Sequence, residues 1–358
     1  WRDWSSDVCS SDLVVIKTSV DATKKYGTSA SASRLITGNN ILYSKLERSV
    51  AKLHNTESAT IFSSGYAANL GVIKALMGQG DLIVLDKLAH SCMIEGALAS
   101  RAEVKRFLHN NYDDLEKILS ANHKKYNNIL ICTESVFSMD GDRADLKTIR
   151  KTAKKYGAWL LVDYAHDIEI FIKKPVKPYK NEIKMGTFSK ALGSLGGYIS
   201  GSKKLIEYIN SKAATLIYST ALPPAVLGAS LKALEIAVKN KELAKKALEN
   251  ARYFLSVIAS ESEAIHRKII LARKDELPRR SAPLNDDTSQ IVPIIIGDTQ
   301  KTIKISEVLE KEGFLVHPIK PPTVPQNTSR LRVSFSASHT KKQIDELAKA
   351  IIEITANN

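Results

Sequence analysis

The chain has 358 residues, 44% of them hydrophobic and 25% charged, which is the composition of a globular protein large enough for one or two domains. No apolar run approaches the ~20 residues that a membrane-spanning helix needs, and no secretory signal is recognisable, so we expect a cytoplasmic location and no membrane partner. The three cysteines, Cys9, Cys92 and Cys132, have neither the number of a disulfide framework nor the spacing of a metal site, so no metal is predicted.

The formal net charge of the chain is +14, and a charge of this size raises the question of nucleic-acid binding. The lysines are scattered as pairs, such as Lys124-Lys125, Lys154-Lys155 and Lys203-Lys204, on amphipathic stretches where they alternate with Glu and Asp. This pattern is typical of solvated helix faces rather than of a nucleic-acid groove. We therefore expect no nucleic-acid partner, although a basic surface can attract an anionic substrate or carrier protein.

The N-terminal part of the chain divides into three pieces. Residues 1–13 are rich in Ser and Asp and show neither helical nor strand periodicity, so we expect a non-native leader outside the fold. Residues 14–40 form an N-terminal segment. Over residues 41–54 apolar side chains recur at the spacing of one helix face, which predicts an amphipathic helix.

From about residue 80, short apolar runs alternate with amphipathic stretches. This alternation, with strands that are apolar along their whole length, is typical of a largely parallel sheet covered by helices on both faces. We therefore expect a large α/β domain over residues 41–240. Its strands are predicted at Leu82–Leu85, Ile129–Ile131, Trp159–Val162, Ile183–Met185 and Tyr198–Ser200, and two of its helices at Asp113–Ser120 and Asp145–Tyr156.

The C-terminal part has a different order of elements. A long helical region is predicted over about residues 224–260. After a polar stretch rich in Pro and Arg, strands are predicted near 289–296 and 331–335 and a final helix near 341–355. This order is typical of an α+β arrangement, so we expect a second, smaller domain over residues 241–358.

Polar side chains follow four of the predicted strands. His90 comes after the first strand, Ser138 after the second, Asp163 and His166 after the third, and Lys190 after the fourth. Because ligands of open parallel sheets bind beyond the carboxyl ends of the strands, these side chains are expected to share one crevice. Taken singly, each is more commonly a helix cap, a turn former or a surface residue. The combination of Asp-x-x-His with a Lys after the next strand is what indicates a catalytic site.

Pyridoxal phosphate accounts for this combination chemically. Its aldehyde needs a lysine amine, for which Lys190 is the candidate. Its ring nitrogen stays protonated beside a carboxylate such as Asp163, and its phenolate oxygen can accept a hydrogen bond from His166. The phosphate needs a helix N-terminus with free backbone N–H groups, which residues 63–69 (SSGYAAN) offer, and Thr187 adds a hydroxyl.

The motifs of the chain resemble those of the α-oxoamine synthase family, within the fold-type I pyridoxal-phosphate enzymes. The likeness covers roughly residues 14–358 and is specific, because many separate motifs occur in the family's order. They are SRLITGNNILYSKLE (33–47), FSSGYAAN (62–69), LDKLAHSCMIEGA (85–97), ESVFSMDGD (134–142), VDYAH (162–166), GTFSKALGSLGGYISG (186–201), YSTALPP (218–224) and PPTVPQNTSRLRVSFSASHT (321–340).

The resemblance implies a mostly parallel seven-stranded sheet between helices, pyridoxal phosphate as the cofactor and a homodimer with shared active sites. Lys190 would bind the cofactor and move the Cα proton of the substrate. Asp163 would pair with the ring nitrogen, His166 with the phenolic oxygen, and His90 would stack on the ring and orient the substrate. By the same resemblance the remaining cofactor contacts come from Gly65, Tyr66, Ser138 and Thr187 and from Ser219 and Thr220 of a neighbouring subunit, and the remaining substrate contacts from Thr323 and Arg332.

Members of this family condense a small amino acid with an acyl thioester. The segments PPTVP (321–325) and TSRLRVSFSASHT (328–340) most resemble members that join L-alanine to a pimeloyl group carried by CoA or by acyl carrier protein, a step of biotin biosynthesis. Members that transfer an acetyl group to glycine share nearly all the motifs and stay open as an alternative. A non-catalytic basic protein on the same fold, with an anionic partner, is the alternative from another class.

The chain departs from the family pattern between the third and fourth predicted strands. Tyr164 stands where the family has the acidic residue of Asp-Glu-Ala-His. The sequence DIEIFIKKPVKPYK (167–180) replaces the family's Gly-rich loop ending in Gly-Arg-Gly, and the interval before Lys190 is correspondingly short. We therefore expect an altered loop over residues 164–180.

Overall fold

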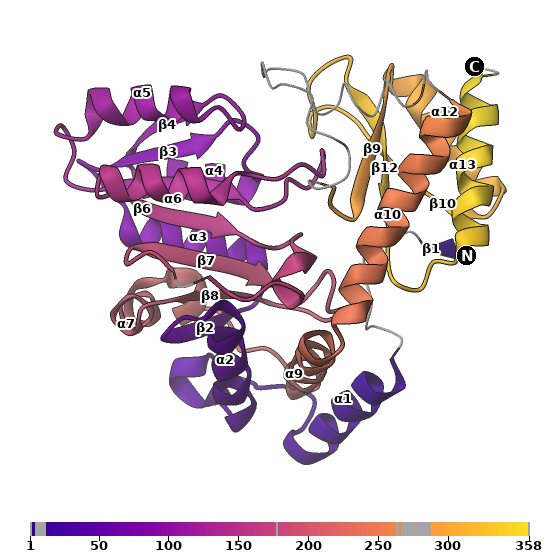
Figure 1. Cartoon of the computed structure of the whole chain (residues 1–358). Helices are drawn as coiled ribbons and strands as arrows, with labels where there is room; N and C mark the ends of the chain where they lie inside the picture. The colour runs from indigo at the N-terminus through magenta and orange to yellow at the C-terminus, as the bar shows by residue number, and fades with distance from the viewer. Residues whose placement is uncertain (1, 4–11, 177, 263–264, 266–287, 357–358) are drawn as a thin grey trace. The chain divides into compact units, whose positions relative to one another are not determined.

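A computed structural model of the chain describes residues 2–3, 12–176, 178–262, 265 and 288–356 (Figure 1). The chain divides into two compact units. The smaller unit consists of Trp1–Ser6, Phe137–Arg143 and Lys241–Asn358, and the larger unit of Asp7–Val136 and Ala144–Asn240. The domain boundaries expected from the sequence, 41–240 and 241–358, are not tested by this division into compact units and stay a prediction.

The larger unit contains a seven-stranded sheet with the strand order β2-β8-β7-β6-β5-β3-β4. Neighbouring strands from β7 to β4 are parallel, whereas β8 is antiparallel to both of its neighbours. The sheet is therefore mostly parallel, as the sequence predicts. The strands are β2 (Ser58–Phe62), β3 (Leu82–Asp86), β4 (Glu103–Phe107), β5 (Ile129–Glu134), β6 (Trp159–Asp163), β7 (Glu182–Thr187) and β8 (Gly197–Gly201).

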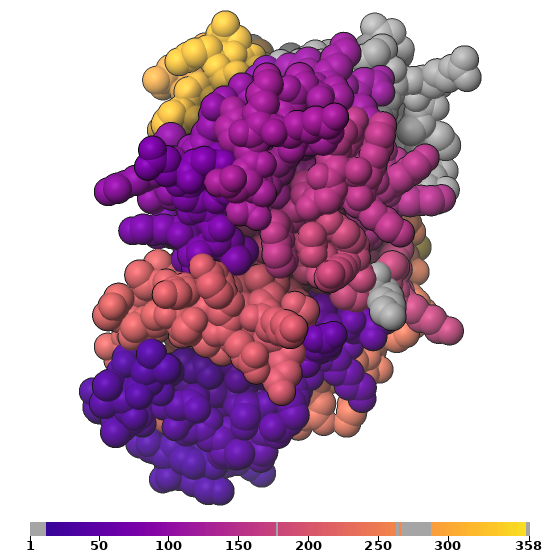
Figure 2. Space-filling view, turned by 90° about the vertical axis from the view of Figure 1, so that its left-hand side faces the viewer, coloured from indigo at the N-terminus to yellow at the C-terminus, as the bar shows by residue number. Residues whose placement is uncertain are grey.

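Helices cover both faces of this sheet (Figure 1). On the face shown in Figure 2, the region around α7 (Lys203–Lys212), in salmon, lies between the N-terminal segment, in indigo, and the segment from β3 to α6, in purple and magenta. No helix in the described part of the chain is both long and apolar enough to cross a membrane. The helices of the larger unit are α1 (Leu13–Tyr26), α2 (Ile41–His54), α3 (Gly65–Leu76), α4 (Ser91–Ser100), α5 (Tyr112–Asn122), α6 (Leu146–Lys155), α7 (Lys203–Lys212), α8 (Ala214–Ile217) and α9 (Pro224–Lys239), with short helices at Arg34–Gly38 and Ile168–Phe171.

The side chains of each central strand divide between the two faces of the sheet. In β3, Ile83 and Leu85 pack with α3 and α4, while Leu82 and Val84 pack with α5 and α6. Successive side chains of a strand point to opposite faces. A strand that is buried on both faces is therefore apolar along its whole length, which is the physical origin of the uninterrupted apolar runs in the sequence.

The register of the parallel strands brings polar residues to one edge of the sheet. Glu134, at the end of β5, pairs with Asp163 at the end of β6, and Asp163 pairs with Met185 of β7. Leu85 of β3 pairs with β5 in the same direction, so that Asp86 ends its strand at this edge too. The carboxyl ends of four strands thus deliver acidic or hydroxyl side chains to a shared edge.

The smaller unit holds a three-stranded antiparallel sheet in the order β11-β12-β9. Three helices and these strands share one apolar core, to which Phe254, Ile305, Phe335 and Ile351 belong. This is the α+β arrangement expected from the sequence. The elements are β1 (Arg2–Asp3), α10 (Lys241–Glu261), β9 (Ile291–Gly297), α12 (Thr299–Lys311), β10 (Phe314–Leu315), β11 (His317–Ile319), β12 (Ser329–Ser334) and α13 (Lys341–Ala356).

A short segment from the middle of the chain, Phe137–Arg143, belongs to the smaller unit. The hydroxyl of Ser289 donates a hydrogen bond to the carbonyl oxygen of Gly141 at 2.6 Å. Asp140 forms an ion pair with Arg330, whose side chain is 5% exposed. Because Ser289, Gly141 and Arg330 are buried, these contacts hold the segment against the core of this unit.

The helical region predicted over residues 224–260 is interrupted. Helix α9 ends at Lys239 and α10 begins at Lys241. Asn240 lies between them with φ −105° and ψ 77°, outside the helical region of backbone angles. Asn is a weak helix former, which is consistent with the break. The apolar periodicity of the sequence continues across Asn240, so it did not reveal that the helix is interrupted.

Residues at both ends of the expected leader have regular structure. Arg2–Asp3 form β1, which pairs in parallel with β10. Helix α1 begins at Leu13, and the carboxylate of Asp12 accepts a hydrogen bond from the N–H of Val14 at 2.8 Å, which is a helix N-cap. Residues 4–11 lie outside the described residues, so the origin of the leader stays a prediction.

The two-sided burial of the sheet predicts a large cost for truncating a central strand. Leu160 in β6 is 0% exposed, and Leu160→Ala should lower the free energy of unfolding by about 2–5 kcal/mol, because it leaves a cavity in a packed core. Leu108, which is 41% exposed, is the matched control, and Leu108→Ala should change the same quantity by no more than about 0.5 kcal/mol. Equal effects in urea denaturation would contradict the packing of this sheet.

Candidate active site

Lys190 and His166 meet beyond the carboxyl ends of β6 and β7. The Nζ atom of Lys190 lies 2.6 Å from Nε2 of His166, which is itself buried. The two strand ends are tied together where the N–H of Tyr164 donates to the carbonyl oxygen of Met185 at 2.8 Å. An amine and an imidazole at this distance can exchange a proton.

Asp163 is held on both of its carboxylate oxygens. The amide Nδ2 of Asn69 donates to Oδ2 at 2.9 Å, and the N–H of Ala165 donates to Oδ1 at 2.8 Å. Asp163 is 5% exposed and Asn69 is 0% exposed, so the carboxylate has one fixed orientation. Asn69 is absent from the residues predicted for the site; the available signal is its position one helical turn after Gly65, on the same face of α3.

His90 continues the row of polar contacts from Asn69. It is the N-cap of α4, where its Nδ1 accepts a hydrogen bond from the N–H of Cys92 at 3.3 Å. The Sγ of Cys92 lies 3.0 Å from that nitrogen and 3.2 Å from Nδ2 of Asn69. Burial lowers the pKa of His90, Asp163 opposes this shift, and the positive charge of Lys190 adds to it. The ring is therefore neutral at neutral pH and can stack on an aromatic group.

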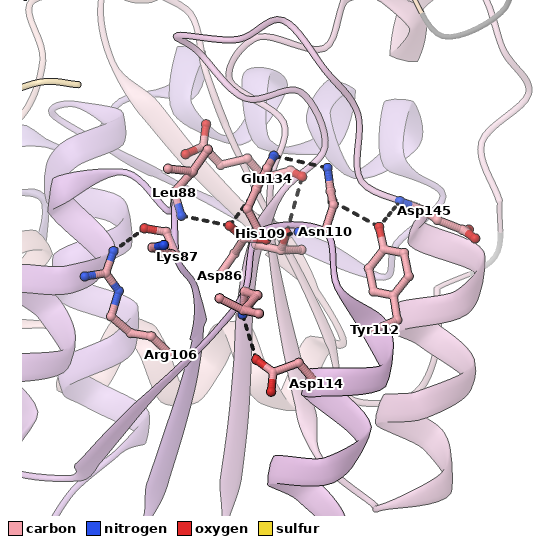
Figure 3. Close-up of polar contacts among 12 residues, drawn as sticks. Asp86, Lys87, Leu88, Arg106, His109, Asn110, Tyr112, Asp114, Glu134 and Asp145 are labelled. Carbon is pink, nitrogen blue, oxygen red and sulfur yellow. Dashed lines mark hydrogen bonds and ion pairs between the residues drawn. The ribbon is translucent and has the colours of Figure 1, made fainter. Parts of the chain in front are cut away.

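A further pair of carboxyl groups lies at the ends of β3 and β5 (Figure 3). Asp86 is within 2.9 Å of Nδ1 of His109 and accepts a hydrogen bond from the N–H of Asn110 at 3.1 Å. Glu134 is buried, and its burial together with the negative charge of Asp163 raises its pKa well above the usual value. Glu134 therefore binds a proton more readily than an ordinary glutamate does, a property that the sequence motif did not reveal.

The first turn of α3 closely approaches the backbone of β8. The hydroxyl of Ser64 caps the helix. A Cβ atom on Gly197 would lie 2.5 Å from the backbone nitrogen of Gly65, and a Cβ atom on Gly65 would lie 3.6 Å from Cβ of Thr187. The hydroxyl of Thr187 donates to the carbonyl oxygen of Gly196 at 2.7 Å. The structure thus brings together the helix N-terminus and the hydroxyl that the sequence assigns to a phosphate.

Three other residues expected at the cofactor lie nearer the surface. Tyr66 is 40% exposed, and its hydroxyl donates a hydrogen bond to Glu95. Ser219 and Thr220 lie in the segment between α8 and α9, where Thr220 pairs through its backbone with Ser33. The described contacts therefore place the latter pair beside the N-terminal part of the larger unit.

Three of the expected site residues belong to the smaller unit. The Nε of Arg332 donates to the carbonyl oxygen of Ser138 at 2.6 Å, so the structure brings these two residues together. Burial lowers the pKa of Arg332 to about 10. Thr323 is exposed and lies in a turn, where its N–H donates to the carbonyl oxygen of Lys320 at 3.0 Å.

Buried rings connect the segment after β6 to the turn before Lys190. The ring of Phe188 lies 5.2 Å from that of Tyr198, Tyr198 lies 5.4 Å from His54, and His54 lies 5.3 Å from Tyr164, as measured between ring centroids. The Nε2 of His54 is 2.9 Å from the hydroxyl of Tyr198. Burial lowers the pKa of His54 to about 3, so this column of rings is uncharged.

The described residues of the larger unit fit pyridoxal phosphate. An amine next to an imidazole suits an aldehyde beside a phenolic oxygen. A buried carboxylate with a fixed orientation suits a protonated ring nitrogen, and Asp163 has this property. The first turn of α3 beside Thr187 suits a phosphate. The donor set is thus complementary to each polar group of the cofactor.

Known proteins of similar sequence span most of the chain. The family model described as aminotransferase class I and II matches residues 3–351. The 8-amino-7-oxononanoate synthase of Methylorubrum extorquens is 42% identical over 344 residues, which are 96% of this chain and 82% of that protein. The putative 8-amino-7-oxononanoate synthase of Caulobacter vibrioides is 40% identical over 339 residues, which are 93% of this chain and 82% of that protein.

Two solved enzyme structures have a fold similar to that of this chain. A point variant of serine palmitoyltransferase from S. paucimobilis, with a bound PLP–myriocin aldimine, superposes with a TM-score of 0.86 at 27% identity; the match covers 97% of this chain and 85% of that chain. The 8-amino-7-oxononanoate synthase of Francisella tularensis superposes with a TM-score of 0.77, covering 99% of this chain and 97% of its own. At 23% identity, the second comparison shows the fold alone.

The contact between Asn69 and Asp163 predicts a role in cofactor affinity. Asn69→Ala should weaken the binding of pyridoxal phosphate about tenfold or more, because a hydrogen bond to a buried charged group is lost. Equilibrium dialysis of the variant measures this change. Asn122→Ala is the matched control, since Asn122 is also a buried amide and donates to Ile118 of α5. Equal affinities of the two variants would refute the role of Asn69.

The low pKa of His54 predicts an acid sensitivity of the fold. Folded His54 has a pKa of about 3 against an ordinary value of 6.5, so the unfolded chain binds the extra proton between these two pH values. The contribution of neutral His54 to the stability of the fold is complete above pH 6.5 and is lost as the pH falls toward 3. Within this window the free energy of unfolding falls by up to about 1.4 kcal/mol per pH unit. His54→Gln should have a shallower slope in denaturation experiments across this window. An unchanged slope would contradict a neutral, buried His54.

Proposed function

Because the chain belongs to the aminotransferase class I and II family, and within it to the α-oxoamine synthases, we propose that it is a pyridoxal-phosphate-dependent acyltransferase that makes 8-amino-7-oxononanoate. In this reaction L-alanine condenses with a pimeloyl thioester on CoA or on acyl carrier protein. A carbon–carbon bond forms between Cα of alanine and the thioester carbonyl carbon. The thiol leaves with a proton, and the alanine carboxyl group leaves as carbon dioxide. The product is a precursor of biotin.

One observation carries this proposal: Lys190 and His166 are in contact beside a carboxylate that is fixed in orientation. The distance of 2.6 Å between Lys190 Nζ and His166 Nε2 brings an amine and a proton carrier together. Asp163 lies on the adjoining strand with both oxygens hydrogen-bonded. The sequence identity of 42% to an 8-amino-7-oxononanoate synthase supports the choice of product.

The residues that would hold the cofactor follow from the donor set. When bound, pyridoxal phosphate supplies an electron sink for the electron pair left on the Cα atom of the amino acid. Lys190 would hold its aldehyde, Asp163 its ring nitrogen and His166 its phenolic oxygen. Further contacts are proposed for His90 on the ring face, for Gly65, Tyr66 and Thr187 at the phosphate, for Ser138 beside the ring, and for Ser219 and Thr220 from a partner subunit.

The same side chains would carry the proton transfers. Lys190 would remove the proton from Cα of alanine and return one to the product. His166 would accept or share that proton through its contact with Lys190 Nζ. The neutral ring of His90 would orient the amino acid, and Thr323 and Arg332 would hold the substrate, since a guanidinium can grip a carboxylate through two parallel hydrogen bonds.

We further propose a homodimer with shared active sites. Exposed apolar side chains support it: Leu35 is 62%, Ile36 75% and Tyr218 85% exposed. The backbone pairing of Ser33 with Thr220 places the first two near the segment that carries the third. Apolar side chains gathered in one region of a surface are typical of an association site. The cytoplasmic location stays an expectation from the sequence.

The proposal is tested with the purified protein and pyridoxal phosphate. The protein should show the visible absorbance of lysine-bound cofactor and should form 8-amino-7-oxononanoate from L-alanine and pimeloyl-CoA or pimeloyl-carrier protein, as detected by mass spectrometry. Lys190→Ala should lose the absorbance and at least about 10²–10⁴-fold of the rate, since it removes the proton-transferring amine. Lys203→Ala, at an exposed position at the start of α7, should keep both.

The choice of substrates decides between the related reactions. Product formation from glycine and acetyl-CoA, without any from alanine and a pimeloyl thioester, would transfer the assignment to the glycine reaction. Cofactor uptake without turnover of any small amino acid would favour a non-catalytic binding protein.

A further inference from the structure

The altered connection between β6 and β7 is anchored by a largely buried cluster of three side chains, Arg150, Tyr164 and Glu182. The guanidinium of Arg150 binds Glu182 through two hydrogen bonds, from Nε to Oε2 at 2.9 Å and from Nη2 to Oε1 at 2.8 Å. Nη2 also donates to the hydroxyl of Tyr164 at 2.9 Å. The side chain of Glu182 is 0% exposed and that of Arg150 is 20% exposed.

The protonation states of the cluster are fixed by its surroundings. Burial alone would lower the pKa of Arg150, but its hydrogen bonds with Glu182 and the neighbouring Tyr164 outweigh that effect and raise it. Burial raises the pKa of Tyr164, with the charge of Glu182 acting in the same direction. Tyr164 is therefore a neutral phenol, which accepts a hydrogen bond from a permanent cation. An ion pair held by two parallel hydrogen bonds has a well-defined geometry.

The far end of the connection is tied to the same place. The N–H of Tyr179 donates to Oε2 of Glu182 at 3.2 Å. The Nζ of Lys184 donates to the carbonyl oxygen of Val176 at 3.4 Å and to that of His54 at 2.9 Å. Tyr164, just after β6, and Tyr179, just before β7, are thus both hydrogen-bonded to the cluster.

His166 lies inside this anchored segment. Tyr164 precedes it, and the N–H of Asp167 donates back to the carbonyl oxygen of Tyr164 at 3.0 Å, which closes a turn around His166. Through its ring, Tyr164 also contacts His54, which packs in turn against Tyr198 in the column of rings that leads to the turn before Lys190. The cluster is therefore linked to the pair of His166 and Lys190 by two routes: along the chain from Tyr164 to His166, and through the rings of His54, Tyr198 and Phe188 to the turn before Lys190.

We propose that Arg150, Tyr164 and Glu182 are positioning residues, which hold His166 at the distance from Lys190 Nζ that proton exchange requires. The inference rests on the proposed function for the meaning of that exchange, whereas the contact between Lys190 Nζ and His166 Nε2 follows from the fold of the chain. It gives a role to the tyrosine that departs from the family motif. Displacements of a proton carrier of about 1 Å can cost a hundredfold in rate, so such anchoring has a measurable effect.

The first test uses the protein without cofactor, so that it stands even if the proposed reaction fails. Tyr164→Phe removes only the hydroxyl, Glu182→Gln removes the charge that pairs with Arg150, and Ile149→Val is the matched control. Ile149 lies next to Arg150 in α6 and is 0% exposed. Its variant loses one buried methyl group outside the cluster. The imidazole resonances of His166, assigned by their disappearance in His166→Asn, are titrated by NMR in each protein.

Tyr164→Phe and Glu182→Gln should shift the titration midpoint of His166 by about half a pH unit or more, because a looser contact changes its interaction with the charged Lys190. Ile149→Val should keep the wild-type midpoint at a comparable loss of thermal stability. If Glu182→Gln does not fold, Tyr164→Phe decides the outcome. A wild-type midpoint in the variants that fold would show that the cluster only stabilises the chain, and would overturn the proposal.

The second test uses the cofactor-loaded enzyme. The two cluster variants should lower kcat about tenfold to a hundredfold and leave KM for the amino acid within about twofold, because a positioning defect acts on the proton transfer rather than on substrate binding. Ile149→Val should keep the wild-type kcat. An unchanged kcat in Tyr164→Phe, or a loss that is confined to KM, would also overturn the proposal.

Discussion

The parallel pairing of β6 with β7 is the constraint on which the rest of the site depends. It sets Asp163 opposite Met185, and the turns that follow the two strands then carry His166 and Lys190 to a separation of 2.6 Å. A shift of this pairing by one residue would send the side chains of β7 to the opposite face of the sheet. Burial on both faces resists such a shift, so the apolar packing of the sheet is also what determines the geometry of the polar site.

Much of this arrangement could be predicted from the sequence. Continuous apolar runs located the five predicted strands, and each of them lies within or at an observed strand of the seven-stranded sheet. The strand ends then pointed to Asp163, His166 and Lys190, since position after a parallel strand is a property of the local sequence. The roles of these residues stay predictions, but their proximity follows from the register of two adjacent strands.

Other features depend on contacts between distant segments and have a weak local signal or none. Asn69 reaches Asp163 from α3, and Arg150 reaches Glu182 from α6. In the sequence Arg150 is an ordinary polar residue of an amphipathic helix, and Asn69 is marked only by its spacing from Gly65. The break at Asn240 was hidden because the apolar pattern continues across it. Tyr164 stood out only as a departure from the family motif, and what its hydroxyl binds became apparent only from the fold.

The membership of Phe137–Arg143 in the smaller unit has a consequence for how this chain could be divided. Residues 241–358 are continuous in sequence, yet they lack Asp140, the ion-pair partner of Arg330. Expressed as an isolated fragment, they would retain a buried guanidinium without its carboxylate, an arrangement that destabilises a protein by about 3–5 kcal/mol. The C-terminal region is therefore not an independent folding unit: Phe137–Arg143 and Trp1–Ser6 also belong to it, and moving it into another protein would require at least the segment that carries Asp140.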